Sequence, residues 1–121
     1  MIKHLGTVPF LNSKPLTYLF DNGFFENYKT SEYYPSSLLD SLVSGETFLS
    51  LLPIADHLSE KNVISLTNYC ISSYGKVDSV LLVSKSKLKD IRTVVLDSRS
   101  KSSNMLFKTI QSHFLNIDVD Y

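Results

Sequence analysis

A short polar turn near the amino terminus carries the side chains best suited to chemistry. Asn12, Ser13 and Lys14 place an amide, a hydroxyl and an ammonium group in succession, just before Pro15. An apolar run precedes them and an amphipathic stretch with proline in its first turn follows, which predicts a strand leading into a helix. Open α/β sheets bind ligands beyond the carboxyl ends of their strands. These side chains are therefore candidates for a binding site, with helix capping by Asn12 or Ser13 as the alternative.

A second polar cluster, residues 97–104, precedes another amphipathic stretch. It contains Ser100, Ser102 and Ser103, whose hydroxyls would stand at the start of a predicted helix. Free backbone N–H groups at such a position favour carboxylates or phosphates, so the cluster is a candidate anion site. Capping of the helix by these hydroxyls is the alternative. A smaller polar stretch, with Ser72 and Ser73, is typical of a turn.

The histidine and cysteine pattern favours neither a metal centre nor a nucleophile. His4, His57 and His113 lie far apart and lack the spacing of metal ligands. Cys70 stands alone in a strand-like run, where we expect a small core residue. The sequence contains no phosphate loop, no dinucleotide fingerprint and no Ser-centred elbow. These residues therefore predict no metal and no bound cofactor.

The elements that must position these clusters alternate along the chain. Periodicity and turn signals predict strands at residues 2–8, 28–34, 48–52, 63–71, 80–83, 93–96 and 117–121, and helices at 15–20, 35–43, 54–58 and 106–114. Residues 80–83 are apolar without alternation, which is typical of a strand covered on both faces. The alternation predicts an α/β fold with mostly parallel strands. The polar clusters would then line one edge of the sheet.

Composition limits the class of protein. The 121 residues are 43% hydrophobic, which is enough apolar material for one core. Twelve basic residues balance twelve acidic ones, without a run of Lys or Arg, which argues against a nucleic acid or an anionic membrane as partner. The apolar runs are too short to span a bilayer and the start does not resemble a signal peptide. Together with the single cysteine, this predicts a cytoplasmic protein.

Seven short segments occur in a fixed order through nearly the whole chain. They are Val8-Pro9-Phe10-Leu11-Asn12-Ser13-Lys14-Pro15-Leu16, Pro35-Ser36-Ser37-Leu38, Ser44-Gly45-Glu46, Leu51-Leu52-Pro53-Ile54, Ile71-Ser72-Ser73-Tyr74-Gly75, Ser79-Val80-Leu81-Leu82-Val83-Ser84-Lys85 and Leu96-Asp97. In order and spacing they resemble the chorismate dehydratase (MqnA) family of the futalosine route to menaquinone. Each segment alone is weak evidence, but the series is specific.

The resemblance implies a two-lobed α/β fold like that of the type II periplasmic binding proteins. Residues 1–90 would form the amino-terminal part of the first lobe, and residues 91–121 the start of the second. The resemblance also implies a cytoplasmic lyase that uses no metal and no organic cofactor. Its reaction removes water from chorismate, a small dicarboxylate, and yields 3-[(1-carboxyvinyl)oxy]benzoate. Neither a nucleic acid nor a membrane is an expected partner.

The same resemblance assigns roles to individual residues. Asn12 would lie beside the reacting ring, and Ser79 would be its catalytic partner. The family's Ser-Arg-Thr-Ser stretch is similar to residues 100–103, so the hydroxyls there would bind a substrate carboxylate. The predicted substrate-binding set is Ser13, Ser72, Ser73, Ser100, Ser102 and Ser103.

The chain departs from the family pattern at three positions. Lys101 stands where arginine is usual, so the charge is kept but a bidentate fork is lost. Ser102 replaces threonine, and Phe10 stands where tyrosine is common. A neutral amide has negligible proton affinity, so we assign Asn12 an orienting role. The general base is therefore not identified by the sequence.

Members of the family are considerably longer, and this chain ends shortly after the second lobe would begin. We therefore expect a truncated family member with open sheet edges. A fragment, or a chain completed by homodimerisation or strand exchange, are the alternatives. A working lyase predicts that Asn12 and Ser79 face one pocket together with the hydroxyls around Ser100. A non-catalytic, carboxylate-binding module predicts that these residues lie apart or open to solvent.

Overall fold

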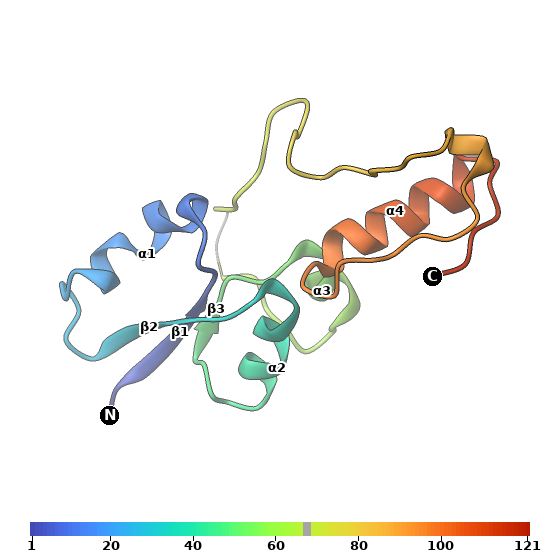
Figure 1. The fold of residues 1–121 in the computed structure, drawn as a ribbon. Helices are drawn as coiled ribbons and strands as arrows, with labels where there is room; N and C mark the ends of the chain where they lie inside the picture. The colour runs from blue at the N-terminus through green and yellow to red at the C-terminus, as the bar shows by residue number, and fades with distance from the viewer. Residues whose placement is uncertain (67–68) are drawn as a thin grey trace.

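A three-stranded parallel sheet forms the centre of the amino-terminal half of the chain. The computed structural model describes residues 1–66 and 69–121. Strands β1 (Lys3–Thr7), β2 (Tyr28–Glu32) and β3 (Leu49–Ser50) lie in the order β2-β1-β3 (Figure 1). The central strand pairs with β2 from Lys3↔Tyr28 to Thr7↔Glu32, and with β3 at Leu5↔Leu49 and Gly6↔Ser50. The predicted α/β class with parallel strands is confirmed.

Helices follow each strand, at the places that local signals predict. Short 3-10 turns η1 (Leu11–Ser13) and η2 (Pro35–Ser37) lead into α1 (Lys14–Asp21) and α2 (Leu38–Val43). Helix α3 (Ile54–Ser59) follows β3, and η3 (Leu88–Asp90) and α4 (Lys101–His113) lie further along the chain. Pro15 stands in the first turn of α1, where its missing N–H costs no helical hydrogen bond. Gly23 and Gly45 take positive φ angles of 73° and 78° in the turns after α1 and α2.

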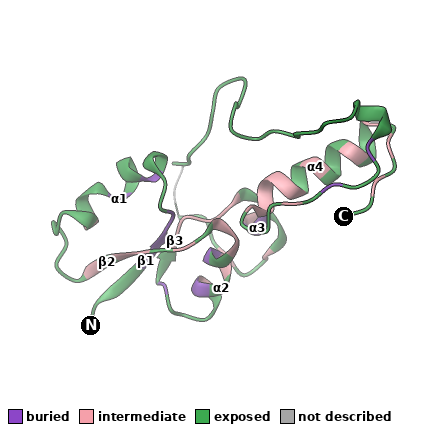
Figure 2. Cartoon of the chain, viewed as in Figure 1, coloured by how far each residue is buried: buried purple, intermediate pink, exposed green. Residues whose placement is uncertain are grey.

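The core is small and lies where α2 covers the sheet. Leu38 of α2 is its most deeply buried large apolar side chain, with 1% of its surface exposed. Figure 2 shows buried segments, in purple, on β1 and α2. Gly6 lets α2 and β3 approach the central strand, because a Cβ atom there would clash with the hydroxyl of Ser50 and lie 3.1 Å from Leu38 Cδ2. A cluster of three rings, Phe20, Phe25 and Tyr28, joins the end of α1 to β2 with centroids 5.0–6.4 Å apart.

The strand prediction for residues 80–83 is wrong. These residues form no strand in the structure, and Leu81 and Val83 are 73% and 85% exposed. A strand covered on both faces needs neighbours that pair with its backbone and cover its side chains. The described part of the chain supplies neither. The apolar pattern therefore indicates a tendency to be buried that the described residues do not satisfy.

Four further strand predictions need correction. Residues 63–66 and 69–71 form no strand, and residues 67 and 68 lie outside the described residues. The stretches 93–96 and 117–121 meet only at an isolated parallel bridge between Thr93 and Asp120. A lone bridge fixes two backbones at a single point, so these stretches are not regular strands. The predicted strand over residues 48–52 shrinks to the two residues of β3.

The burial of α4 and of the cysteine also differs from expectation. Figure 1 shows α4 extending away from the sheet. The apolar residue Leu106 of α4 and its C-cap residue Phe114 are exposed. Cys70 is exposed as well, so the prediction of a small core residue is wrong. Ser37 and Ser100 occupy N-cap positions without a side-chain capping hydrogen bond. Among the described residues, no helix is long and apolar enough to cross a bilayer.

Candidate functional site

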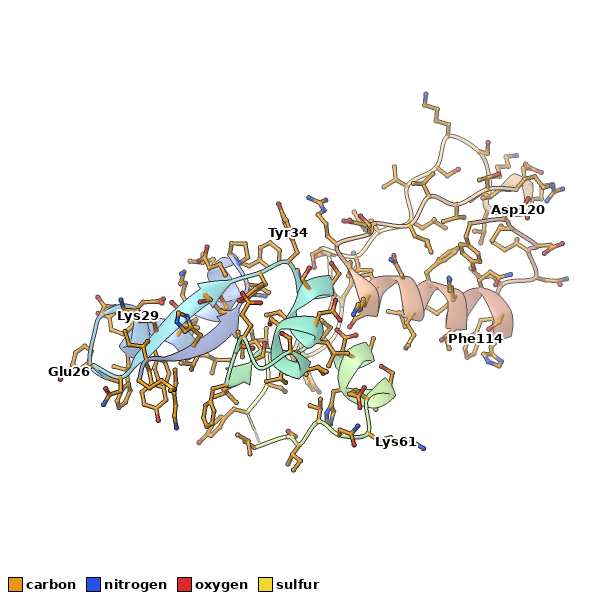
Figure 3. The ribbon with its side chains drawn as sticks, turned by 90° about the horizontal axis from the view of Figure 1, so that it is seen from below. Glu26, Lys29, Tyr34, Lys61, Phe114 and Asp120 are labelled. Atoms are coloured by element: carbon orange, nitrogen blue, oxygen red, sulfur yellow. The ribbon has the colours of Figure 1, made fainter. Side chains whose placement is uncertain are left out.

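The carboxyl edge of the sheet gathers the polar groups of three different elements. The strands are parallel, so their carboxyl ends meet at this edge, where open α/β sheets bind ligands. Asn12 follows β1 in turn η1, Tyr34 follows β2 just before η2, and Asp56 follows β3 in α3 (Figure 3 labels Tyr34). The first turn of α4 packs against α3, and so joins the same edge.

The turn that carries Asn12 is held from inside by Ser13. Ser13 is fully buried, and its hydroxyl lies 2.9 Å from the carbonyl oxygen of Val8 and 2.7 Å from that of Phe10. The residue stands at the N-cap position of α1 but makes no side-chain capping bond. Its proton is therefore used within the turn, while Asn12 is exposed. A substrate-binding role for Ser13 stays a prediction.

Lys14, the third polar residue of the turn, is paired with two carboxylates. Its ammonium group lies 3.4 Å from Asp21 Oδ2 and 3.4 Å from Glu32 Oε1. The charge of Asp21 is the largest influence that raises the pKa of Lys14. Asp21 also accepts hydrogen bonds from Thr30 at 2.6 Å and Thr17 at 3.0 Å, and the bond from Thr30 is the main cause that lowers the pKa of Asp21. This network connects α1 to β2, so we assign Lys14 a structural role.

The first turn of α4 is attached to α3 by two polar contacts on consecutive residues. The Lys101 ammonium lies 3.0 Å from Asp56 Oδ1. The backbone N–H of Ala55 donates to the Ser102 hydroxyl at 3.3 Å, across 47 positions of sequence. Within the turn, the Ser100 hydroxyl donates to that of Ser103 at 2.8 Å. The structure thus brings Ser100, Ser102 and Ser103 together beside a cation, as a carboxylate site requires.

Arg99, which lies just before α4, forms an ion pair with Asp97. Its guanidinium donates to both carboxylate oxygens of Asp97, from Nε at 3.0 Å and from Nη2 at 3.1 Å. The hydrogen bonds that Arg99 donates to Asp97, and the charge of that carboxylate, raise the pKa of Arg99. Arg99 precedes α4, so Lys101 is the cation within the first turn of the helix.

The remaining predicted site residues lie on an exposed segment. Ser72, Ser73 and Ser79 are exposed and lie outside helices and strands. Figure 1 shows this part of the chain as a yellow loop that projects away from the sheet. Two surface hollows are formed elsewhere, one by residues 87–89 and 114–117, and the other by residues 81–84, 91 and 93–95. A pocket that joins Asn12, Ser79 and Ser100 stays a prediction.

Sequence reasoning missed Asp56, Tyr34 and Arg99. Asp56 had only a weak local signal, an acidic residue in a short helix that begins after Pro53. Its importance comes from contact with a residue far along the chain, which no local pattern shows. Among residues 1–66 and 69–121, no group of three or more His, Cys, Asp or Glu side chains could hold a metal ion.

Comparison with known proteins places the whole arrangement in context. A family model described as menaquinone biosynthesis matches residues 3–121, from the first residue of β1 to the last residue of the chain. No curated protein gives a significant match, and neither does any solved structure. The family match covers the sheet, the polar edge and α4 alike.

Proposed function

The chain belongs to the menaquinone biosynthesis family, and on that premise we propose that it is a lyase of the chorismate dehydratase type. The substrate would be chorismate and the product 3-[(1-carboxyvinyl)oxy]benzoate, in the futalosine route to menaquinone. The resemblance of the seven ordered segments supports this finer assignment.

The observation that carries the proposal is the placement of Asn12. Its amide is exposed just beyond the carboxyl end of the central strand, in a turn that the buried Ser13 holds in shape. Contacts with Asp56 and Ala55 hold the Lys101 ammonium group and the Ser102 hydroxyl at the same edge of the sheet. An amide and a carboxylate-binding group at one sheet edge suit a small dicarboxylate with a reacting ring.

The reaction asks the protein to position groups and to move protons. A base removes a ring proton, the neighbouring hydroxyl leaves as water after it is protonated, and the ring becomes aromatic. Lys101 and the hydroxyl of Ser103 would hold a carboxylate through charge-assisted hydrogen bonds, with Ser100 orienting Ser103. Asn12 would orient the ring or a water molecule, with Ser79 as its partner. Correct orientation accounts for much of the rate acceleration in such a reaction.

The proposed architecture is the two-lobed fold of the type II periplasmic binding proteins. Residues 1–90 would contribute to the first lobe and residues 91–121 to the second. In support, the sheet and α4 are separate units in Figure 1, and the contact between α3 and α4 joins them. The substrate would lie between the lobes, at the carboxyl edge of the sheet.

A non-catalytic, carboxylate-binding module is the second candidate. It is favoured by the exposure of Asn12 and Ser79, since an amide and a hydroxyl in bulk water cannot exclude solvent from a reacting ring. This candidate keeps the carboxylate site on α4 and omits the chemistry. It therefore predicts binding of chorismate without turnover.

Incubation of the purified chain with chorismate separates the two candidates. The aromatic product is followed by its ultraviolet absorbance, and binding by calorimetry on the same sample. We expect turnover, and a drop in kcat/KM of about 100-fold in Asn12→Ala because the ring is no longer oriented. Asn62→Ala, at an exposed asparagine outside the sheet edge, is the matched control and should keep full activity. Binding without turnover by a folded chain would support the module, and absence of both would contradict each candidate.

A further inference from the structure

Asp56 is a buried carboxylate for which the proposed reaction has no role so far. We propose that Asp56 is a positioning residue, which fixes the ammonium group of Lys101 as the counter-charge for a carboxylate of the substrate. The inference rests on the proposed function. It adds a residue of α3 to a site whose other carboxylate-binding groups all belong to α4.

The two partners of this ion pair differ in exposure. The Asp56 side chain is 5% exposed and the Lys101 side chain 37% exposed, so the carboxylate is the inner partner and the ammonium the outer one. Asp56 Oδ1 lies 3.0 Å from Lys101 Nζ. Asp56 Oδ2 is shielded from solvent and has no hydrogen-bond partner among the described residues. An ammonium group has three N–H donors, so two remain for a ligand that approaches from solvent.

A substrate carboxylate would add to Lys101 without displacing Asp56. Release of Lys101 would leave a buried carboxylate with no partner on either oxygen, because Oδ2 already lacks one. The cost of leaving a buried charge uncompensated exceeds the return from one hydrogen bond to a charged group. Asp56 therefore keeps Lys101 in place while the ligand binds.

The neighbouring contact fixes the hydroxyls relative to this ammonium. Ala55 precedes Asp56 in α3, and Ser102 follows Lys101 in α4. The backbone N–H of Ala55 donates to the hydroxyl of Ser102. Two contacts between consecutive residues set both the position and the rotation of the α4 first turn. The Ser103 hydroxyl accepts from Ser100, so its own proton is free for an outside acceptor. A carboxylate would thus meet an ammonium group, a hydroxyl and the start of a helix.

The test compares wild type with Asp56→Asn, Lys101→Gln and the double variant. Chorismate affinity is measured by calorimetry, and KM and kcat by the ultraviolet assay. We expect Asp56→Asn to raise Kd and KM about tenfold, with kcat changed by less than about twofold. Lys101→Gln should raise them at least as much. The double variant should bind no more weakly than Lys101→Gln alone, because Asp56 acts through Lys101.

The direction in which Asp56→Asn changes the Kd for chorismate shows whether Asp56 positions Lys101 or acts only through its own negative charge. Removal of a negative charge near an anionic ligand would strengthen binding through long-range electrostatics alone. Weaker binding therefore indicates a displaced ammonium group. Asp40→Asn, at an exposed carboxylate of α2, is the matched control and should leave Kd unchanged. A purely structural role would lower the folded fraction and kcat while KM stays constant.

The outcomes bear separately on this inference and on the proposed function. Unchanged or tighter binding by folded Asp56→Asn, or additive effects in the double variant, overturns the inference and leaves the lyase proposal intact. Tenfold weaker binding in a chain that shows no turnover supports the inference and contradicts the lyase. If wild type does not bind chorismate, both fail. Should Asp56→Asn not fold, Asp56→Glu takes its place, since its longer side chain shifts the ammonium; an unchanged Kd there also overturns the inference.

Discussion

The buried hydroxyl group of Ser13 stabilises the turn after β1. Ser13 lies within hydrogen-bond distance of the carbonyl oxygens of Val8 and Phe10, and none of its surface is exposed. Helix capping by Asn12 or Ser13 was the alternative that the sequence left open. Ser13 does occupy the N-cap position, but its side chain bonds back into the turn and makes no capping hydrogen bond. The exposure of Asn12 is a consequence of this inward bond.

We expect Ser13→Ala to lower the free energy of unfolding by about 1 to 2 kcal/mol, because the buried carbonyl groups lose their donor. The measurement is urea denaturation followed by circular dichroism. Ser112→Ala is the matched control, since Ser112 also donates to a carbonyl, at 3.1 Å, but on the exposed surface of α4. Equal effects of the two substitutions would contradict the role assigned to Ser13.

The lowered pKa of Asp21 predicts how the stability of the folded chain depends on pH. Its pKa in the folded chain lies below the ordinary value of 3.8, chiefly because Thr30 donates a hydrogen bond to it. A lowered folded-state pKa contributes stability above the unfolded value, and this stability is lost as the pH falls through the folded value. Thr30→Val should move the pKa of Asp21 up toward 3.8 and weaken the loss of stability below pH 4. Carbon-detected NMR titration of the Asp21 carboxyl measures the first effect, and acid unfolding curves the second.

A control variant tests whether the change in the Asp21 pKa comes from loss of the hydrogen bond that Thr30 donates. Thr109→Val changes an exposed threonine of α4 in the same way and should leave the titration of Asp21 as it is in wild type. An unchanged pKa in Thr30→Val would mean that Lys14 and Thr17, the remaining partners, hold the carboxylate by themselves.

At the scale of elements, the close approach of three elements depends on one glycine. Gly6 of β1 faces Leu38 of α2 and Ser50 of β3 with no room for a methyl group. The Ser50 hydroxyl is buried and has no hydrogen-bond partner among the described residues. The packing of α2 onto the sheet therefore depends on a missing side chain at the central strand.

Gly6→Ala should cost about 1 to 3 kcal/mol of unfolding free energy, because the added methyl group overpacks the core. Ser50→Ala should cost little or be stabilising, since it removes a buried hydroxyl that lacks a partner. The double variant should recover part of the loss, although the contact with Leu38 remains. Denaturation midpoints of the four chains give the coupling, and strict additivity would contradict this packing.

At the scale of the whole molecule, apolar surface is exposed on the segments that join the sheet to α4. Leu81 and Val83 line a hollow together with residue 91 and residues 93–95. Exposed apolar stretches with strand propensity favour association between chains. We therefore expect this surface to influence solubility more than folding.

We expect Leu81→Lys to slow aggregation of the purified chain and to change Tm by no more than about 3 °C, because Leu81 contributes little to the core. Val94→Lys is the contrasting variant, since Val94 is buried. It should lower Tm by more than about 10 °C, because a charge would be forced into an apolar site. Static light scattering and thermal denaturation measure the two properties. Aggregation of Leu81→Lys at the wild-type rate would show that another surface is responsible.

The sequence by itself determined the elements that depend on nearby residues. Pro15 and Gly23 marked the beginning and end of α1, and Gly45 the end of α2, because these residues restrict the backbone wherever they stand. The three strands of the sheet and the order of the motifs were also readable, and the motif order identified the family that residues 3–121 match.

Only the tertiary structure decided which apolar runs become strands and which charged side chains form ion pairs. Residues 80–83 have the composition of a buried strand, yet a strand exists only where another backbone pairs with it. The ion pair of Asp56 with Lys101 depends in the same way on how α3 and α4 pack. Periodicity measures the environment a segment prefers, whereas pairing and burial are properties of two segments together. For that reason the sheet edge and its amide could be predicted, and the buried carboxylate beside them could not.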